Sequence, residues 1–598
     1  MSVNSVREDE AQIEVSKKDT LRRLYRYLIV YKKELVIVGL LLFVTVSISL
    51  FSPLLIERAI DVHVANRDIT RLLCLGLFGF GLYVIFTLGT RLWMLRIAKV
   101  TNRVLVIIRE ELYAHIQTLS FHFFDSRPTG KVLARIIGDV NSLKEMLSDS
   151  ITKLVPELLT VAGVAVIMLI KNWKLALAAL LTLPILTVGM FVIQTVTHRR
   201  WQVYRKKSSN LNAFIHEDMA GIGVIQSFAA EEETRDDFYR LADEQCQSFV
   251  DAVRVADLFG PLVEITWGLG AFLLYFIGIK VVGAENVGIG TFLAFATYLG
   301  MFWNPIRNLA NFYNKLVTNL SAAERIFDIL DTPADIIDKE GAVMLPKVKG
   351  AVRFDHVTFA YSDEPEQNVL EDVSFQVQPG QTIALVGPTG AGKTTIVNLI
   401  SRFYDVTSGK IYLDDYEVHD VTLQSLRSQM GIMTQDNFLF TGTIRENICY
   451  GKLDATDEEM VAAAKAVNAH DFIMKLEGGY DTEISERGTQ LSIGQRQLLA
   501  FARTMISNPG ILILDEATSS IDTHTELLVQ DGIRHMLANR TSFVVAHRLS
   551  TIRSADRIFV IDAKGIQEDG SHEELMAKKG AYYRLYQSQF EETSCIPL

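Results

Sequence analysis

Long runs without a charged side chain constrain this chain more than any other feature of its sequence. Leu35–Ile56 contains 22 consecutive uncharged residues, and a helix needs about 20 apolar residues to cross the hydrocarbon core of a membrane. Further uncharged runs occupy residues 72–90, 175–197 and 287–306, and the apolar segments 154–170 and 258–279 each carry one carboxylate, Glu157 and Glu264. The sequence therefore predicts an all-α membrane domain of about six spanning helices.

The connections between these runs alternate in length and in charge. Residues 57–71, 171–174 and 280–286 form short connections, whereas 91–153 and 198–257 each cover about sixty residues. Both long connections begin with basic residues, among them Arg91, Arg96, Arg199 and Arg200. Because Lys and Arg favour the cytoplasmic side, we expect the long connections and both termini in the cytoplasm of a multi-pass protein of the cell membrane.

Neither long connection has the composition of a loop. Residues 100–119 and 208–244 contain few Gly or Pro and recurrent apolar positions, so the membrane helices should continue well past the bilayer before the chain reverses. Turn residues place the reversals near 121–130 and 216–228. Short transverse helices that transmit force to the following domain are expected there, with plain helix hairpins as the alternative.

The ends of the membrane domain have their own signatures. After a polar tail at residues 1–18, residues 19–33 put Leu21, Leu24, Tyr25 and Leu28 near one face of a helix and arginines around the other. This pattern predicts a helix on the cytoplasmic surface of the bilayer, and a solvated helix packed on protein is the alternative. The membrane domain is expected over 19–330 and a Pro-containing, mixed-charge linker over 331–350.

A different pattern begins at residue 351, where short β-rich runs alternate with helical ones. It predicts an α/β domain over 351–590, followed by a tail at 591–598.

The domain contains a G-x-x-x-x-G-K-[ST] motif directly after an apolar strand at 382–386: Gly387, Pro388, Thr389, Gly390, Ala391, Gly392, Lys393 and Thr394. Such a loop closes backbone N–H groups around phosphate oxygens, Lys393 adds a positive charge on the β- and γ-phosphates, and the Thr394 hydroxyl suits Mg²⁺. A helix from Thr395 to Ile400 should direct its positive end at the anion.

Four polar residues follow three other apolar strands of this domain. Asp515 and Glu516 end the run 511–514, where Asp515 could hold Mg²⁺ and Glu516 could polarise the attacking water. His547 ends the run 544–546 and could contact the γ-phosphate. Gln435 follows 430–434 and offers an amide to the metal or the water.

Together with Leu491-Ser492-Ile493-Gly494-Gln495-Arg496-Gln497, this set resembles the ATP-binding cassette exporters in their half-transporter form. The resemblance covers nearly the whole chain and implies ATP and Mg²⁺ as cofactors. It implies that Tyr361 stacks on adenine, that Gln435 is the Q-loop residue and that 491–497 is the signature motif, with Ser492, Gly494 and Gln495 at the nucleotide. It also implies that Glu486 belongs to a loop facing the membrane domain and that 520–522 is the D-loop.

A signature motif presents a helix start to a γ-phosphate that another domain holds. One copy of each motif therefore predicts a dimer, and the resemblance implies two nucleotides shared between two chains. Ile493 stands where the family usually has glycine. Because a β-branched side chain adds bulk beside the anion site, we expect a different partner chain and unequal ATP sites, with a homodimer as the alternative.

The substrate class is only partly constrained. Net charge of −11 argues against nucleic acid as a partner, and the membrane spans argue against a soluble mechanical ATPase acting on nucleic acid or ribosomes. ATP-driven export or flipping of a hydrophobic or amphiphilic small molecule, lipid or peptide is expected, through a cavity that alternates between the two sides of the membrane. An importer or a sensory membrane ATPase is the alternative. Because a charge is costly at the bilayer centre, Glu264 should face the bundle interior or a partner.

Overall fold

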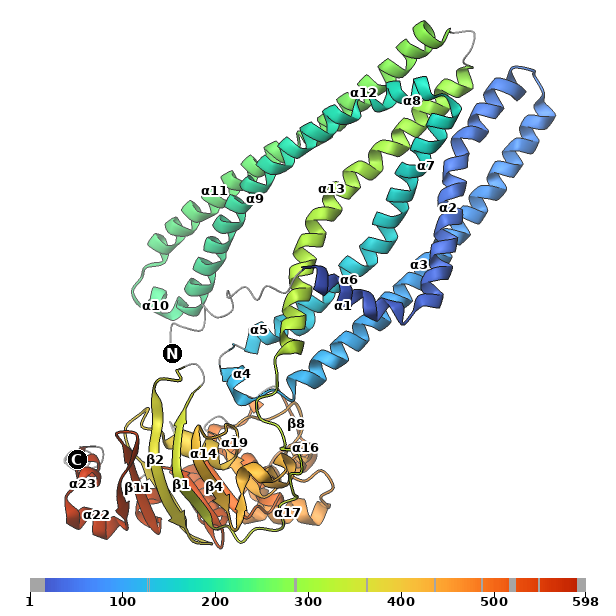
Figure 1. Cartoon of the computed structure of the whole chain (residues 1–598). Helices are drawn as coiled ribbons and strands as arrows, with labels where there is room; N and C mark the ends of the chain where they lie inside the picture. Colours follow the sequence, from blue (N-terminus) through green and yellow to red (C-terminus); the bar gives the residue numbers. More distant parts are fainter. Residues whose placement is uncertain are drawn as a thin grey trace. The chain divides into compact units, whose positions relative to one another are not determined.

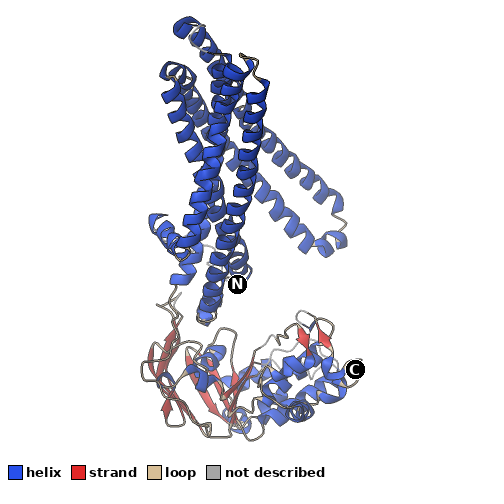
Figure 2. Ribbon diagram, turned by 90° about the vertical axis from the view of Figure 1, so that its right-hand side faces the viewer, coloured by secondary structure: helices blue, strands red, loops and turns tan. Residues whose placement is uncertain are grey.

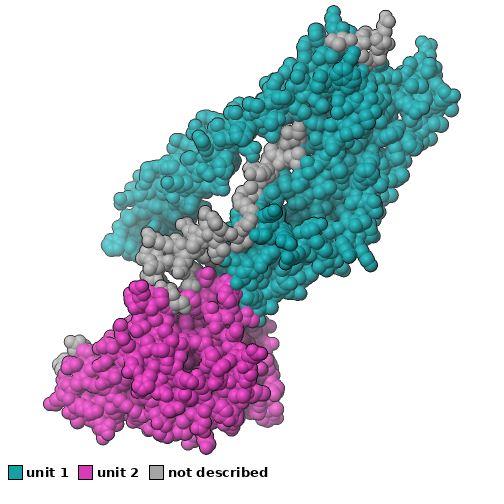
Figure 3. Space-filling model, viewed as in Figure 1, with its two compact units in different colours: residues 1–117, 129–331 teal, residues 118–128, 332–598 magenta. Residues whose placement is uncertain are grey.

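Long helices make up the first part of the chain, and helices packed on sheets make up the second (Figures 1 and 2). The structure, a computed structural model, describes residues 17–125, 127, 129–283, 288–361, 364–434, 437–485, 488–515, 523–546 and 549–588. It has two compact units, 1–117 with 129–331 and 118–128 with 332–598 (Figure 3).

The first unit is helical throughout its described residues. Its main helices are α2 (Lys32–Arg58), α3 (Ile69–Ile116), α7 (Val155–Lys171), α8 (Trp173–Leu180), α9 (Leu183–Ala220), α11 (Glu231–Ala256), α12 (Phe259–Ile277) and α13 (Ile289–Asp331). Among the described residues, five helical stretches are long and apolar enough to cross a membrane, and the sixth predicted span forms the first part of α13, where Ile289–Phe302 is apolar. The membrane helices of the predicted fold are thus confirmed.

The helices continue far beyond their apolar stretches, as the composition of the long connections predicts. Helix α3 contains 48 residues and α9 contains 38. A short helix stands at each predicted reversal: α4 (Phe121–Asp125) after α3, and α10 (Ile222–Ser227) between α9 and α11. The short connecting elements α5 (Thr129–Ala134) and α6 (Val140–Asp149) lead from α4 back toward α7.

Helix α1 (Lys17–Ile29) forms where the sequence predicts an amphipathic helix, and its apolar residues differ in exposure in the single chain. Leu24 is 2% exposed, whereas Leu21 is 43% and Tyr25 61% exposed. Polar contacts fix this orientation: Tyr27 Oη donates to Glu111 at 2.6 Å, and both terminal nitrogens of Arg23 donate to Asp331 at 2.6 and 2.7 Å. The face of α1 that packs on the rest of the first unit therefore makes polar as well as apolar contacts. Leu21 and Tyr25 lie outside this packed face.

The second unit is built on two main sheets. The antiparallel sheet has the order β2-β1-β4-β5 and comprises β2 (Asn368–Val377), β1 (Val352–Ala360), β4 (Ser408–Leu413) and β5 (Tyr416–Glu417). The six-stranded sheet has the order β12-β11-β3-β10-β9-β6: β12 (Gly565–Gly570), β11 (Arg557–Asp562), β3 (Thr382–Val386), β10 (Thr541–Val545), β9 (Ile511–Asp515) and β6 (Met430–Met433). Its parallel strands are buried on both faces, as a parallel sheet covered by helices requires.

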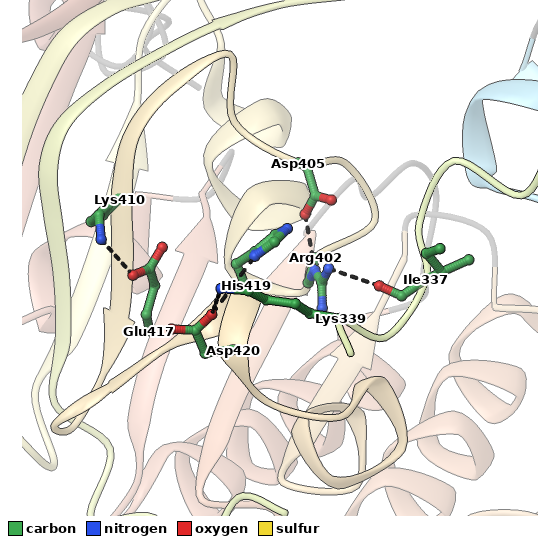
Figure 4. Close-up of polar contacts among 8 residues, drawn as sticks. All are labelled: Ile337, Lys339, Arg402, Asp405, Lys410, Glu417, His419 and Asp420. Carbon is green, nitrogen blue, oxygen red and sulfur yellow. Dashed lines mark hydrogen bonds and ion pairs between the residues drawn. The ribbon is translucent and has the colours of Figure 1, made fainter. Parts of the chain in front are cut away.

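The segment predicted as a linker lies on this second unit. Val343 forms a parallel bridge with Val421, and Lys339 Nζ donates to Asp420 at 2.6 Å. Figure 4 shows Arg402 between Asp405 and the backbone of Ile337, which accept from its Nε at 2.9 Å and its Nη2 at 3.0 Å. Arg402 is 2% exposed, so these bonds replace part of the hydration that a buried guanidinium loses.

Candidate functional site

Four parallel strands bring the candidate residues to one edge of the six-stranded sheet. Val545 of β10 pairs with Leu385 of β3 on one side and with Asp515 of β9 on the other. Met433 of β6 pairs with Leu514. Because parallel strands end at the same edge, the phosphate loop, Asp515 and the residues that follow β6 and β10 all leave the sheet there.

The phosphate loop depends on two of its glycines for its path. Gly387 has a φ of 149°, and a Cβ there would lie 2.1 Å from the backbone oxygen of Ile561. Gly392, the N-cap of α14 (Lys393–Ile400), has a φ of 101°. Since L side chains rarely adopt these conformations, no other residue can take their places without moving the loop.

Lys393 lies folded against this loop. Its Nζ donates to the backbone oxygens of Gly387 at 2.8 Å and Pro388 at 2.9 Å. Burial lowers the pKa of Lys393, and the negative charge of Asp515 opposes this effect. A polyphosphate beside the loop would add negative charge and so favour the protonated amine.

A cavity of about 530 Å³ adjoins the loop and is lined by Tyr361, Asn368, residues 388–391 and Lys564. The hydroxyls of Tyr361 and Thr395 lie 3.0 Å apart. Thr395 is 4% exposed beneath this contact, whereas Thr394 is exposed on the first turn of α14. A nucleoside triphosphate fits this site, because the glycine-containing loop and the Lys393 amine suit its phosphates and the Tyr361 ring bounds the adjoining cavity.

The signature segment forms the start of α19 (Ile493–Ile506). Ser492 is the N-cap: its Oγ accepts from Gln495 N at 3.2 Å, and Gln495 Oε1 accepts from Ser492 N at 3.0 Å. This reciprocal pair is a capping box. Ile493 is 45% exposed and Gly494 is buried, so the unusual side chain projects away from its own unit.

Several predicted site residues lie outside the described residues: Gln435, Glu486, Glu516, His547 and the segment 520–522. In sequence Glu516 directly follows Asp515, and Gln435 and His547 each follow a strand end by two residues. Lys564 was not foreseen at this site. Its signal is the turn Asp562-Ala563-Lys564-Gly565 between β11 and β12, which only the sheet order brings next to β3.

In the membrane unit, Glu264 lies on α12 and is exposed in the single chain. The described residues of the same chain therefore do not enclose the Glu264 carboxylate, which was expected to face the bundle interior or a partner.

Two protein-family models match the sequence: "ABC transporter transmembrane region" over residues 35–306 and "ABC transporter" over 370–519. A Bacillus subtilis protein described as an uncharacterized ABC transporter ATP-binding protein is 41% identical over 95% of this chain and 94% of its own length. The ATP-dependent lipid A-core flippase of Syntrophus aciditrophicus is 38% identical over 82% of this chain and 81% of its own.

A solved structure of a bacterial Atm1-family ABC exporter with ATP bound is also similar. Its TM-score is 0.76 at 28% identity, over 94% of this chain and 98% of the other. The match extends through both the membrane helices and the ATP-binding domain. This chain therefore belongs to the ATP-binding cassette exporters, membrane proteins that couple ATP hydrolysis to transport.

Proposed function

We propose that this chain is one half of a dimeric exporter that moves a hydrophobic or amphiphilic substrate out across the cytoplasmic membrane. The observation that carries the proposal is the loop and cavity at the edge of the six-stranded sheet, joined in one chain to six apolar helical stretches. The presence of the nucleotide site and the membrane helices in one polypeptide supports direct coupling of nucleotide turnover to helix movement.

Each residue role at this site is part of the proposal. Lys393 and the loop N–H groups hold the phosphates, Tyr361 stacks on adenine, and Thr394, Asp515 and Gln435 hold Mg²⁺. Bound Mg²⁺ supplies positive charge to the phosphate oxygens. Glu516 orients the attacking water, and His547 contacts the γ-phosphate.

Dimerisation follows from the count of motifs. The sequence contains one phosphate loop and one signature segment, and the helix start at Ser492 points a positive partial charge away from its own helix. Two chains arranged head to tail would complete two nucleotide sites. Ile493 supports a different partner chain, because its exposed bulk lies at the surface that a partner's nucleotide would meet.

The proposed orientation puts both termini and the ATP-binding domain in the cytoplasm. The basic residues beside the long connections support it. Among the aromatic residues of the membrane helices, which could line a substrate cavity, Trp267, Tyr275 and Phe276 are exposed in the single chain. Tyr298 is buried and donates to Leu50 O at 2.7 Å, so Tyr298 has a packing role.

The similarity to a lipid A-core flippase supports an amphiphilic substrate. The test is to reconstitute the purified transporter in proteoliposomes and to measure ATPase activity and uptake into inside-out vesicles with lipids and hydrophobic cations. We expect stimulation by at least one amphiphile together with its ATP-dependent accumulation. ATPase activity that no amphiphile stimulates, with no accumulation, would contradict the proposal.

A further inference from the structure

A network of polar contacts joins the end of α2 to the beginning of α13. Helix α2 continues into a π-helical turn, η3 (Ala59–Val64), which carries Asp61. Asp61 Oδ1 accepts from Gly290 N at 2.6 Å, and Asp61 Oδ2 accepts from Thr291 N at 3.0 Å. A carboxylate from one helix thus caps the first turn of another, where a negative charge is most favourable.

A second carboxylate extends the network. Thr291 Oγ1 donates to Glu57 Oε1 at 2.9 Å and lies 3.2 Å from Asp61 Oδ2. The other Glu57 oxygen accepts from Lys171 Nζ at 2.9 Å, at the end of α7. We call Glu57, Asp61, Gly290 and Thr291 the outer latch, since the proposed orientation puts this end outside the cytoplasm.

The close approach at the latch requires glycine. A Cβ on Gly290 would lie 2.6 Å from the backbone oxygen of Glu57, and a Cβ on Gly288 would lie 2.3 Å from Asp61 Oδ2. A larger side chain at 290 would push the backbones of the two helices apart, and one at 288 would displace the Asp61 carboxylate. The latch is therefore a contact between backbones as well as between side chains.

Next to the latch, a cavity lies mainly between α2 and α3. Thr297 and Met301 of α13 share this cavity of about 570 Å³ with Ser52 and Ile56 of α2, and α3 forms the rest of its wall. Further along, Tyr298 Oη donates to Leu50 O at 2.7 Å. Phe295, Tyr298 and Phe302 of α13 share a buried apolar cluster with Leu50 of α2, so apolar packing holds these helices together along their length and the latch adds polar contacts at their ends.

We propose that Asp61 is a positioning residue for transport, which holds α2 against α13 and so keeps the outer end of the pathway closed. Its two accepted N–H groups belong to the helix that must move away when this end opens. Opening exchanges these bonds for bonds to water, which makes the closed state favourable but reversible. The inference rests on the proposed export function and on the orientation given with it.

The test is a cysteine reporter in the assembled transporter, with its four native cysteines replaced by serine. Thr297→Cys places a thiol in the cavity beside the latch, and a membrane-impermeant maleimide is added from the outside. Without nucleotide we expect slow labelling, and Asp61→Ala should raise the rate about fivefold, the factor that about 1 kcal/mol of lost hydrogen bonding makes in an equilibrium. Gly290→Ala should raise it too, since the added methyl group forces the helix ends apart while Asp61 is intact.

Asp68→Ala is the matched control. Asp68 accepts from Arg71 N at 3.0 Å and caps α3 at the same end of the bundle, and among the described residues its carboxylate contacts are with Arg71, so its loss should leave the labelling rate unchanged. Thr291→Val, which removes only a hydroxyl, serves as a milder second variant with a smaller increase.

Equal labelling of Asp61→Ala, Thr291→Val and the parent protein would overturn the proposal, as would an equal increase in Asp68→Ala. A second measurement, labelling of the parent protein with ATP and vanadate present, distinguishes failure of the latch proposal from failure of the proposed export function. If nucleotide changes the rate but Asp61→Ala does not, only the latch is wrong. If nucleotide never changes it, the alternating pathway itself is wrong.

Discussion

At the residue scale, the chemistry depends on carboxylates at the end of β9. Asp515 influences the pKa of Lys393 from this position, and Glu516 is the next residue in the chain. Glu516→Gln removes a base while keeping shape and hydrogen bonding. We expect kcat to fall at least about a hundredfold, the lower end of general-base effects, with ATP affinity retained. Steady-state hydrolysis and equilibrium binding of a fluorescent ATP analogue measure the two quantities.

Glu477→Gln is a suitable control for this prediction, because Glu477 is exposed on the same domain. It should leave both quantities unchanged. Near-normal turnover in the assembled Glu516→Gln transporter would show that the water is activated elsewhere.

Gly387 permits a prediction about the loop itself. In Gly387→Ala the new Cβ would meet the Ile561 backbone oxygen at 2.1 Å, at a φ of 149°. The loop must shift, so we expect ATP binding to be lost. Gly380→Ala is the control for a positive φ alone, since Gly380 has a φ of 80° and open space around the added methyl group. Nucleotide binding by both variants checks the prediction, and tight binding by Gly387→Ala would contradict it.

At the element scale, strands and spans are predictable where one segment determines its own structure. The strand 382–386 and the helix that follows it were confirmed because a buried apolar run and a glycine loop are local signals. The extension of α3 beyond its apolar stretch was predicted for the same reason, and α3 contains 48 residues. The polar contacts of α1 were not predicted, since they are made with Glu111 and Asp331, which lie far away in the sequence.

Contacts between distant segments escaped prediction in the ATP-binding domain and the membrane unit alike. The Tyr361–Thr395 contact joins the end of β1 to α14, and the outer latch joins η3 to α13. Each residue alone has an ordinary local role, such as capping or solvation. Only the packing of whole helices and sheets brings the partners together.

Helix α19 gives a prediction at this scale. Ser492→Ala removes the side-chain half of its capping box, which stabilises a helix start by about 1 kcal/mol. We expect amides in the first turn of α19 to exchange hydrogen about fivefold faster, and ATPase activity to fall if Ser492 also meets a partner's nucleotide. Ser507→Ala changes the other end of the helix, where Ser507 Oγ donates to Thr504 O at 2.8 Å, and should leave the first turn unchanged. Unchanged exchange in Ser492→Ala would show that the cap is dispensable.

At the scale of the whole molecule, one chain contains the parts of two half-sites. The loop side has Gly387, Lys393 and Asp515 in place, whereas the signature side has the exposed Ile493 in place of the family's glycine. The loop of this chain should therefore hydrolyse ATP once a partner supplies an intact signature. The site that this chain's signature completes should turn over slowly.

This asymmetry leads to the prediction of a different partner chain. Expressed alone, the chain should give weak ATPase activity without substrate stimulation, because any homodimer would contain two altered signatures. In the complete transporter, Glu516→Gln should nearly abolish turnover, whereas Ile493→Gly should mainly change how tightly the second site retains nucleotide, since removing the β-branched side chain frees the helix start. Trapping of labelled nucleotide with vanadate, counted per complex, distinguishes one competent site from two. A stable homodimer with two equivalent sites and full substrate-stimulated activity would contradict the prediction, and Ile493 would then be a tolerated substitution in a symmetric exporter.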